Sequence, residues 1–244
     1  MRLSAILVEY KTPDVLELAL ASLRRFAPEV EAVVVPGQEG AAAHAEGIAE
    51  ARRRRLVGDA DGVILLDTDV CITSPRWVER LQATVSAGGI WGGLKHKGDV
   101  SQVIHEGQLI IHANCLAMPR DLFEAVPSFA AVIQDGAEFV EVDTAAGVSL
   151  FAAAKGRPVV PLPCFRVGHG PLFPGLNCAE YFDPLSGRET LWSHLGRGTS
   201  ARPRHPRLQA LKAALGFRAA RKIWGWQQTR QAWIARGRDL LKTA

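Results

Sequence analysis

The sequence predicts an α/β fold in which a mostly parallel sheet is flanked by helices. Three short apolar runs have the composition of strands that are buried on both faces: residues 3–8, 31–35 and 63–66. Each is followed by a segment of helical spacing or composition: residues 12–23, 40–55 and 75–85. Because strands that alternate with helices form parallel sheets with crossover connections, the first half of the chain predicts a nucleotide-binding type of α/β unit.

Helix starts are marked by polar residues beside proline. Thr12 is the expected N-cap of the first helix, with Pro13 in its first turn, and Ser74 is the expected cap of the helix over 75–85. The second half is less periodic, with strands expected at 88–95 and 108–111 and helices at 119–126 and 143–155. From Pro206 onward the chain is helical in composition, with interruptions expected at Gly216 and Gly225.

The composition is that of an ordinary globular domain, with 48% hydrophobic and 22% charged residues. No stretch reaches the roughly 18–20 apolar residues that span a bilayer, and the apolar start is interpreted as a first strand rather than a signal peptide. Four widely spaced cysteines without a Cys-x-x-Cys pair argue against a zinc knuckle or a redox motif. We therefore expect free thiols in a cytoplasmic protein.

Charge is distributed unevenly along the chain. Residues 201–244 hold 11 of the 29 Lys and Arg residues but only one of the 25 acidic residues. A mildly acidic body with a basic tail indicates an anionic partner for the tail rather than a nucleic-acid-binding protein, which would be basic throughout.

The most informative motif is Asp67-Thr68-Asp69, which follows the apolar run 63–66 directly. Side chains two positions apart in an extended segment point the same way, so both carboxylates are expected to serve one site. Oxygen ligands of this kind suit Mg²⁺ or Mn²⁺, and such an ion stabilises the charge that grows on a departing diphosphate. The alternative is that the two acids only begin a solvated turn.

Four segments carry a resemblance to a known family. They are an apolar strand, a Tyr-containing turn and a helix (5–23), a glycine turn into an Ala-rich helix (37–54), a strand, Asp-x-Asp and helix unit (61–81), and a late His-plus-glycine loop (192–200). Together they resemble the family 2 glycosyltransferases of the GT-A fold, including bacterial rhamnosyltransferase-like members. Glu9 and Lys11 stand where that family usually has Asn.

The resemblance implies a division of the chain. It is close over residues 1–95, the expected nucleotide-sugar-binding half, and loose over 96–200, the expected acceptor half. These halves form the predicted GT-A-like glycosyltransferase domain, 1–200. Residues 201–244 lie outside the resemblance and form a basic, amphipathic helical tail.

The resemblance also implies roles for single residues. Glu9 and Tyr10 would contact the nucleobase, and Gly40 would lie against the donor. Asp67 would face the ribose or donor sugar and, with Asp69, ligate Mn²⁺ or Mg²⁺. His194 would complete the metal or diphosphate site, and Arg197 would approach a phosphate.

An inverting transfer needs a base on the acceptor side, opposite the leaving diphosphate. The family usually supplies Asp or Glu near the start of a late helix, where this chain has Asp143, with Glu141 as the nearby alternative. Asp143 also fits the role of a plain helix cap, and one residue can do both.

The resulting hypothesis is a metal-dependent, inverting glycosyltransferase that moves a hexosyl or deoxyhexosyl group from a nucleotide-diphosphate sugar to a glycan or lipid-linked acceptor. The alternatives are a nucleotidyltransferase, although residues 5–14 lack its Gly-rich triphosphate loop, and a non-catalytic nucleotide-sugar-binding module. The apolar stripe of the tail has three open interpretations: peripheral attachment to an anionic membrane, packing on its own domain, or contact with a second subunit of a homodimer.

Overall fold

The computed structural model describes most of the chain. The described residues are 1–38, 41–94, 104–105, 108–129, 131–135, 138–142, 146–162, 164–165, 170–183, 189–196, 214, 216 and 218–243.

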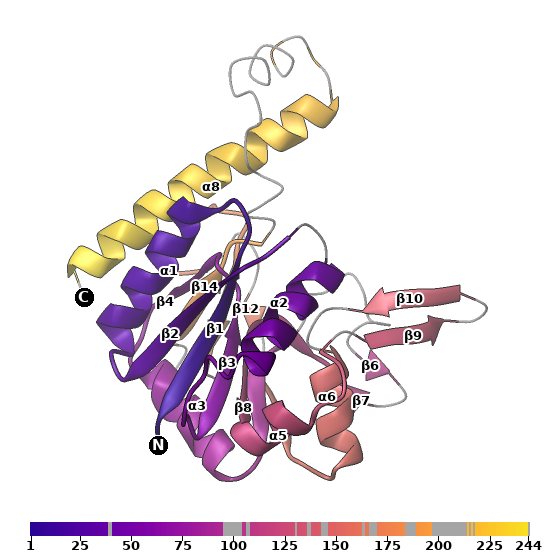
Figure 1. The fold of residues 1–244 in the computed structure, drawn as a ribbon. Coiled ribbons are helices and arrows are strands. Elements are labelled where there is room, and N and C mark those ends of the chain that lie inside the picture. Colours follow the sequence, from indigo (N-terminus) through magenta and orange to yellow (C-terminus); the bar gives the residue numbers. More distant parts are fainter. Residues whose placement is uncertain are drawn as a thin grey trace.

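A six-stranded sheet forms the centre of the molecule (Figure 1). Its order is β11 (Val159–Leu162), β5 (Ile90–Leu94), β8 (Ile111–Pro119), β3 (Gly62–Leu66), β1 (Leu3–Glu9) and β2 (Val30–Pro36). Strands β2, β1 and β3 are mutually parallel, as are β11 and β5, and β8 lies antiparallel between the two groups. The predicted α/β class with a mostly parallel sheet is therefore confirmed.

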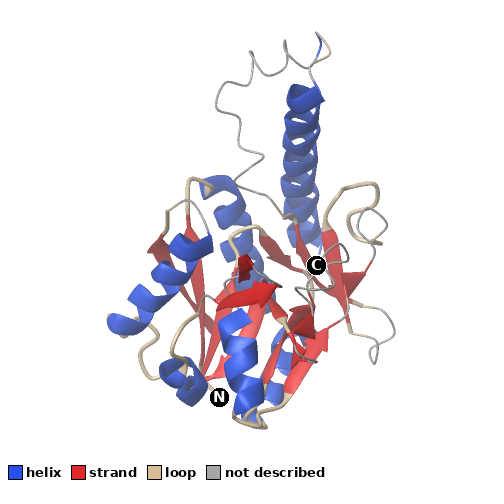
Figure 2. Ribbon diagram, turned by 90° about the vertical axis from the view of Figure 1, so that its right-hand side faces the viewer, coloured by secondary structure: helices blue, strands red, loops and turns tan. Residues whose placement is uncertain are grey.

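Helices cover both faces of this sheet (Figure 2). One face packs against α1 (Pro13–Phe26) and α3 (Arg76–Ser86), and the other against α2 (Ala41–Arg53), α5 (Arg120–Ala125) and α6 (Ala146–Ala154). In β1, Leu3, Ala5 and Leu7 enter the first core, whereas Ile6 and Val8 enter the second. This alternation explains the continuous apolar run in the sequence, since both faces of the strand are buried.

A second sheet of four antiparallel strands packs against the core on the α1 and α3 side. Its order is β12 (Cys164–Phe165), β13 (Ala179–Phe182), β14 (Thr190–His194) and β4 (Val70–Ile72). Two short hairpins complete the described strands: β6 (Ile104–His105) with β7 (Gln108–Leu109), and β9 (Ala131–Asp135) with β10 (Glu138–Val142). The aromatic rings of Tyr181 and Trp192 stack at 4.5 Å within the second sheet.

Strand β8 is the main element that the sequence analysis missed. It was expected as a short strand at 108–111, but it runs to Pro119 and occupies the middle of the large sheet. Its residues include Asn114, Ala117 and Met118, which have no strong preference for strands. Cross-strand pairing with β3 and β5 and complete burial override that weak local preference.

Both predicted helix caps differ in detail from the structure. Thr12 occupies the N-cap position of α1 but makes no side-chain cap hydrogen bond, and its hydroxyl instead lies 3.2 Å from the hydroxyl of Thr68. Helix α3 begins one residue later than predicted, after Pro75. The Ser74 hydroxyl still accepts a hydrogen bond from the backbone N–H of Arg76, at 3.1 Å, so it satisfies one of the free donors of that helix end.

Three cysteines whose side chains are described are buried free thiols: Cys71, Cys115 and Cys178. Burial raises the pKa of Cys71 and Cys115 to about 12 and that of Cys178 to about 11. All three are therefore protonated at neutral pH and act as packing residues.

The C-terminal helix α8 (Arg218–Thr243) runs without a break through Gly225, so the predicted interruption there is wrong. Its second half lies along α1, where Trp233 is fully buried and donates a hydrogen bond from Nε1 to Ser193 Oγ at 3.0 Å (Figure 1). Arg230 forms an ion pair with Asp14 across the same contact. Within the described residues, neither α8 nor any other helix is long and apolar enough to cross a membrane.

Close approach of α8 to α1 depends on Gly237. A Cβ atom at this position would lie 2.6 Å from Cδ2 of the buried Leu18, whereas a Cβ at Gly225 meets nothing within 4 Å. Two glycines of one helix thus have different roles, since only Gly237 lies in a packed contact.

We predict that Gly225→Ala raises the free energy of unfolding by up to about 1 kcal/mol, because alanine favours a helix interior over glycine. Gly237→Ala should gain less than this or lose stability, because its methyl group displaces Leu18. Chemical denaturation of the two variants measures the difference. An equal gain for both would show that α8 does not pack closely on α1.

Candidate metal centre

The Asp67-Thr68-Asp69 motif forms a tight turn between β3 and β4. The backbone N–H of Val70 donates to the carbonyl oxygen of Asp67 at 3.3 Å, and the N–H of Asp67 donates to the carbonyl oxygen of Asn114 at 3.0 Å. The prediction that the two carboxylates align because the segment is extended is therefore wrong. They lie close together because the chain turns between them.

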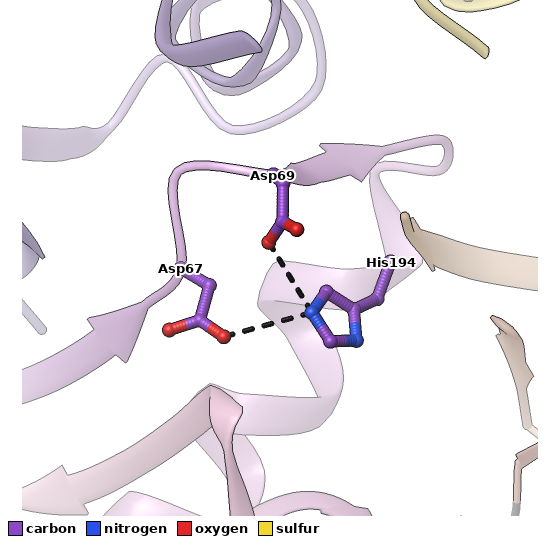
Figure 3. A group of neighbouring side chains, drawn as sticks. All are labelled: Asp67, Asp69 and His194. Carbon is purple, nitrogen blue, oxygen red and sulfur yellow. Dashed lines mark ion pairs between the residues drawn. The ribbon is translucent and has the colours of Figure 1, made fainter. Parts of the chain in front are cut away.

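Pairing between β4 and β14 brings His194 to this turn. His194 lies opposite Val70 in the strand register, and the N–H of Leu195 donates to the carbonyl oxygen of Asp69 at 3.0 Å. Nε2 of His194 is 3.2 Å from Oδ1 of Asp69 and 3.6 Å from Oδ2 of Asp67 (Figure 3). The structure thus brings together all three residues to which the resemblance assigned the metal.

The geometry and chemistry of this cluster fit a divalent cation. One ligand atom from each of the three side chains lies within 4.8 Å of the others. Two ligands at about 2.1 Å from a common ion and at right angles to each other are about 3 Å apart, close to the observed spacing of Nε2 and the carboxylate oxygens. Two carboxylate oxygens with one imidazole nitrogen form a donor set that suits Mn²⁺, and Mg²⁺ through its oxygens.

The electrostatics of the cluster also favour a cation. Burial raises the pKa of Asp67 above its ordinary value, and the negative charge of Asp69 raises it further, while the neighbouring histidines His44, His194 and His112 oppose the shift. The ionised carboxyl group of Asp67 is therefore held in a place that disfavours its charge. A bound divalent cation would remove this penalty.

Two further histidines border the cluster, and neither was among the predicted site residues. Nε2 of His44, in the first turns of α2, lies 3.7 Å from Oδ1 of Asp67. The ring of His112, on β8, lies 5.6 Å from the ring of His194. His44 belongs to the segment that resembles a donor-binding region, which is the sequence feature that would have identified it.

Asn114 and Tyr181 support the cluster from inside the protein. Nδ2 of the fully buried Asn114 lies 2.8 Å from the hydroxyl of Tyr181 and 3.1 Å from Nδ1 of His194. A fully buried Asn in a mainly apolar strand is unusual, because burial of an amide is unfavourable unless hydrogen bonds compensate. This feature of the sequence would have pointed to the site.

Glu9 and Tyr10 lie at the end of β1, next to β3, on the same edge of the sheet as Asp67. Oε1 of Glu9 accepts a hydrogen bond from the backbone N–H of Thr12 at 2.7 Å, and Nζ of Lys11 lies 4.7 Å from the centre of the Tyr10 ring. The carboxylate of Glu9 thus closes the turn before α1. The contact between the hydroxyls of Thr12 and Thr68 joins this turn to the Asp67-Thr68-Asp69 turn.

The remaining residues assigned to the site cannot be placed relative to the cluster. Gly40, Asp143 and Arg197 lie outside the described residues. Glu141 belongs to β10, but its side chain is outside the described part of the structure.

The solved structures that resemble this fold include several transferases. No family model matches the sequence, and no curated protein matches it. Among solved structures, a mannosyltransferase from Pyrobaculum calidifontis in complex with GDP-Man and Mn²⁺ has a TM-score of 0.48 at 12% identity, over 97% of this chain and 86% of its own.

Two further structures match over about two-thirds of each chain. Glucosyl-3-phosphoglycerate synthase from Mycobacterium tuberculosis, in complex with Mn²⁺, UDP and phosphoglyceric acid, has a TM-score of 0.43 at 12% identity and covers 66% of this chain and 68% of its own. The catalytic domain of Drosophila β1,4-galactosyltransferase 7, in complex with xylobiose, has a TM-score of 0.42 at 17% identity and covers 66% and 65%. These neighbours include the enzyme class that the N-terminal sequence resembles. Because every TM-score is below 0.5, the function must be argued from the chain's own site.

We predict that Asp67→Asn raises the melting temperature of the metal-free protein at neutral pH. The raised pKa of Asp67 means that its ionised form is less favourable in the folded than in the unfolded chain, where the pKa is near 3.8. The gain should be present above the folded-state pKa and should vanish as the pH falls toward 3.8. Thermal melts across this range test it.

Asp59→Asn is the matched control, because the Asp59 side chain is 81% exposed and should change the melting temperature little. Destabilisation of the metal-free protein by Asp67→Asn would contradict the electrostatic description of the site.

Proposed function

We propose that this protein is a glycosyltransferase that depends on a divalent metal and moves a sugar from a nucleotide-diphosphate donor. The observation that carries the proposal is the convergence of Asp67, Asp69 and His194 at the edge where parallel strands β1 and β3 end. Ligands of open α/β sheets bind beyond the carboxyl ends of the strands. A cation ligated there lies in position to meet the phosphates of a nucleotide.

In this proposal Asp67, Asp69 and His194 hold Mn²⁺ or Mg²⁺. The cation would neutralise the negative charge that develops on the diphosphate as the bond to the sugar breaks. His44, whose Nε2 lies 3.7 Å from Oδ1 of Asp67, is suited to orient that carboxylate or to donate a hydrogen bond to a phosphate oxygen. Arg197, directly after the positive-φ Gly196, would approach the same phosphates.

The base and ribose of the donor are assigned to the turn after β1. Tyr10 would stack on the base, with Glu9 shaping the turn and Gly40 lying against the donor. The link between Thr12 and Thr68 supports this assignment, because it joins the donor turn to the metal turn. Donor binding at the turn after β1 would therefore affect the position of the Asp67-Thr68-Asp69 turn.

For the acceptor side we propose an inverting transfer of a hexosyl or deoxyhexosyl group to a glycan or lipid-linked acceptor, as in polysaccharide biosynthesis. Asp143 would take the proton from the attacking hydroxyl, with Glu141 as the alternative base. The new glycosidic bond would then form on the face of the sugar opposite the leaving diphosphate.

Peripheral attachment to an anionic membrane is a further part of the proposal. Trp233 is buried against the protein's own domain, which leaves exposed basic residues such as Arg238 and Lys242 as the contacts with lipid. Attachment through them would be electrostatic and lost in high salt. Association of two chains through the tail is the alternative, and vesicle co-sedimentation with and without salt distinguishes the two.

We expect nucleoside diphosphates to raise the melting temperature only when Mn²⁺ is present. A ligand at 100 times its Kd stabilises the folded state by about 2.7 kcal/mol. Asp69→Ala should abolish this gain, because it removes a carboxylate that faces His194 at 3.2 Å. Thermal shift with a panel of nucleoside diphosphates, with and without Mn²⁺, is the measurement, and Asp59→Ala is the exposed control.

His194→Ala should weaken nucleoside diphosphate binding more than binding of the bare nucleoside, since His194 faces the carboxylates of the metal turn and not the donor turn after β1. Equal loss for both ligands would make the histidine structural. If nucleotide stabilises the Asp69→Ala variant with unchanged Mn²⁺ dependence, Asp69 does not ligate the metal and the proposed function is refuted.

Asp143→Asn is expected to leave donor binding intact and to lower turnover by about 10² to 10⁴, the usual effect of losing a general base. Glu141→Gln is the paired variant, and full activity is expected for it. The reverse result in steady-state assays would transfer the role of base to Glu141.

A further inference from the structure

The two ring nitrogens of His194 face different partners. Nε2 points at the carboxylates of Asp67 and Asp69 (Figure 3). Nδ1 lies 3.1 Å from Nδ2 of the Asn114 amide. A neutral imidazole carries one proton, so one nitrogen donates a hydrogen bond and the other offers a lone pair. What Asn114 presents to Nδ1 therefore determines what Nε2 can do.

A cation at the carboxylates requires the lone pair of Nε2. The proton of His194 must then lie on Nδ1, and the group that faces Nδ1 must accept a hydrogen bond. Of the two polar atoms of the Asn114 amide, only Oδ1 can do so. The structure has Nδ2 of Asn114 facing Nδ1 instead. Because Nδ2 can only donate, Nδ1 must be the acceptor in this arrangement, and the proton of a neutral His194 would then lie on Nε2.

Either orientation of the amide leaves one of its polar atoms without a partner among these contacts, so hydrogen bonding within the metal-free protein does not strongly favour one over the other. Within the described part of the chain, Oδ1 of Asn114 is buried and has no hydrogen-bond partner. A half-turn of the amide about its Cβ–Cγ bond exchanges oxygen and nitrogen in nearly the same volume. Oδ1 would then accept hydrogen bonds from Nδ1 of His194 and from the hydroxyl of Tyr181, the two atoms that Nδ2 contacts now.

The backbone around this amide is fixed, so the side chain alone is able to turn. The carbonyl oxygen of Asn114 accepts the N–H of Asp67 at 3.0 Å, and its own N–H donates to Nδ1 of His112 at 2.9 Å. Asn114 therefore touches one metal-facing residue through its backbone and another through its side chain. Among the residues in these hydrogen bonds, Asn114 alone contacts both Asp67 and His194.

We propose that Asn114 is a positioning residue whose amide selects the tautomer of His194 and so makes Nε2 available to a divalent cation; this rests on the metal site of the proposed function. In the metal-free state Nδ2 donates to Nδ1, and the proton of His194 is on Nε2. With a cation bound, the amide is turned, Oδ1 accepts from Nδ1–H, and Nε2 ligates. The proton leaves one ring nitrogen and the other gains one from solvent, so His194 releases none overall.

The first test reads the tautomer directly in the wild-type protein. Imidazole nitrogen spectra of ¹⁵N-histidine-labelled protein are recorded without metal and with Zn²⁺, a diamagnetic ion that accepts nitrogen and oxygen ligands. We expect His194 to carry its proton on Nε2 without metal and on Nδ1 with Zn²⁺. If His194 keeps its proton on Nε2 in the Zn²⁺-loaded protein, Nε2 does not ligate the ion and the proposal is overturned. This result does not depend on the folding of any variant.

The second test compares variants of similar size by Mn²⁺ and Zn²⁺ titration calorimetry. Asn114→Leu keeps the volume but offers no acceptor, and metal affinity should fall about 10- to 100-fold, the usual effect of losing such a partner. Asn114→Asp offers an acceptor in either orientation and should retain affinity within about tenfold of wild type. Met118→Leu, a buried change in the same strand, should have no effect.

The outcomes separate this proposal from the proposed function. If wild-type protein binds neither ion, or Asp69→Ala binds them equally well, the metal site itself is wrong. If wild type binds and Asn114→Leu binds with the same affinity and the same Nδ1–H tautomer, the metal site stands and Asn114 has no positioning role. If Asn114→Asp loses as much metal affinity as Asn114→Leu, the positioning role is also refuted. Packing, and not hydrogen bonding, would then account for the lost affinity.

Discussion

Antiparallel pairing of β4 with β14 is the constraint on which the candidate site depends. It places His194 beside Asp69 although the two are separated by more than half of the chain. Helix α8 supports the same strand, because Trp233 donates a hydrogen bond to Ser193, the neighbour of His194. The tail that seemed separate in the sequence is thus packed directly behind the cluster, and its position is coupled to that of the histidine.

The cluster lowers the stability of the metal-free protein but is suited to bind a cation. Asp67 lies beside Asp69 at the edge of a buried sheet, where desolvation and repulsion from Asp69 disfavour the charge of Asp67. A protein core gains nothing from such a pair, since each ionised group would be more favourable in water. The surrounding histidines offset part of this cost without removing it. A bound cation would offset the cost that remains, as follows from the charge and burial of Asp67.

The site also joins the two sheets of the molecule. Asp67 and Asn114 come from the large sheet, whereas His194 and Tyr181 come from the small one. Hydrogen bonds from Asn114 cross between them, and the ring of Trp192 in the small sheet contacts that of Trp91 in β5 of the large sheet, with centres 5.4 Å apart. Movement of one sheet against the other would change the distance from Nε2 of His194 to the carboxylates, so the packing of the sheets sets the geometry for binding.

Local patterns in the sequence were sufficient to predict strands β1, β2 and β3, the helices that follow them and the carboxylate pair at the end of β3. These features depend on short apolar runs, proline and neighbouring residues, all of which act within a few positions. The place of β8 in the sheet, the folding of Asp67-Thr68-Asp69 into a turn, and the partnership of His44 and Asn114 with the cluster were decided only by tertiary structure. Each depends on pairing or burial between segments far apart in the chain, and no local preference encodes which distant strand will supply the partner.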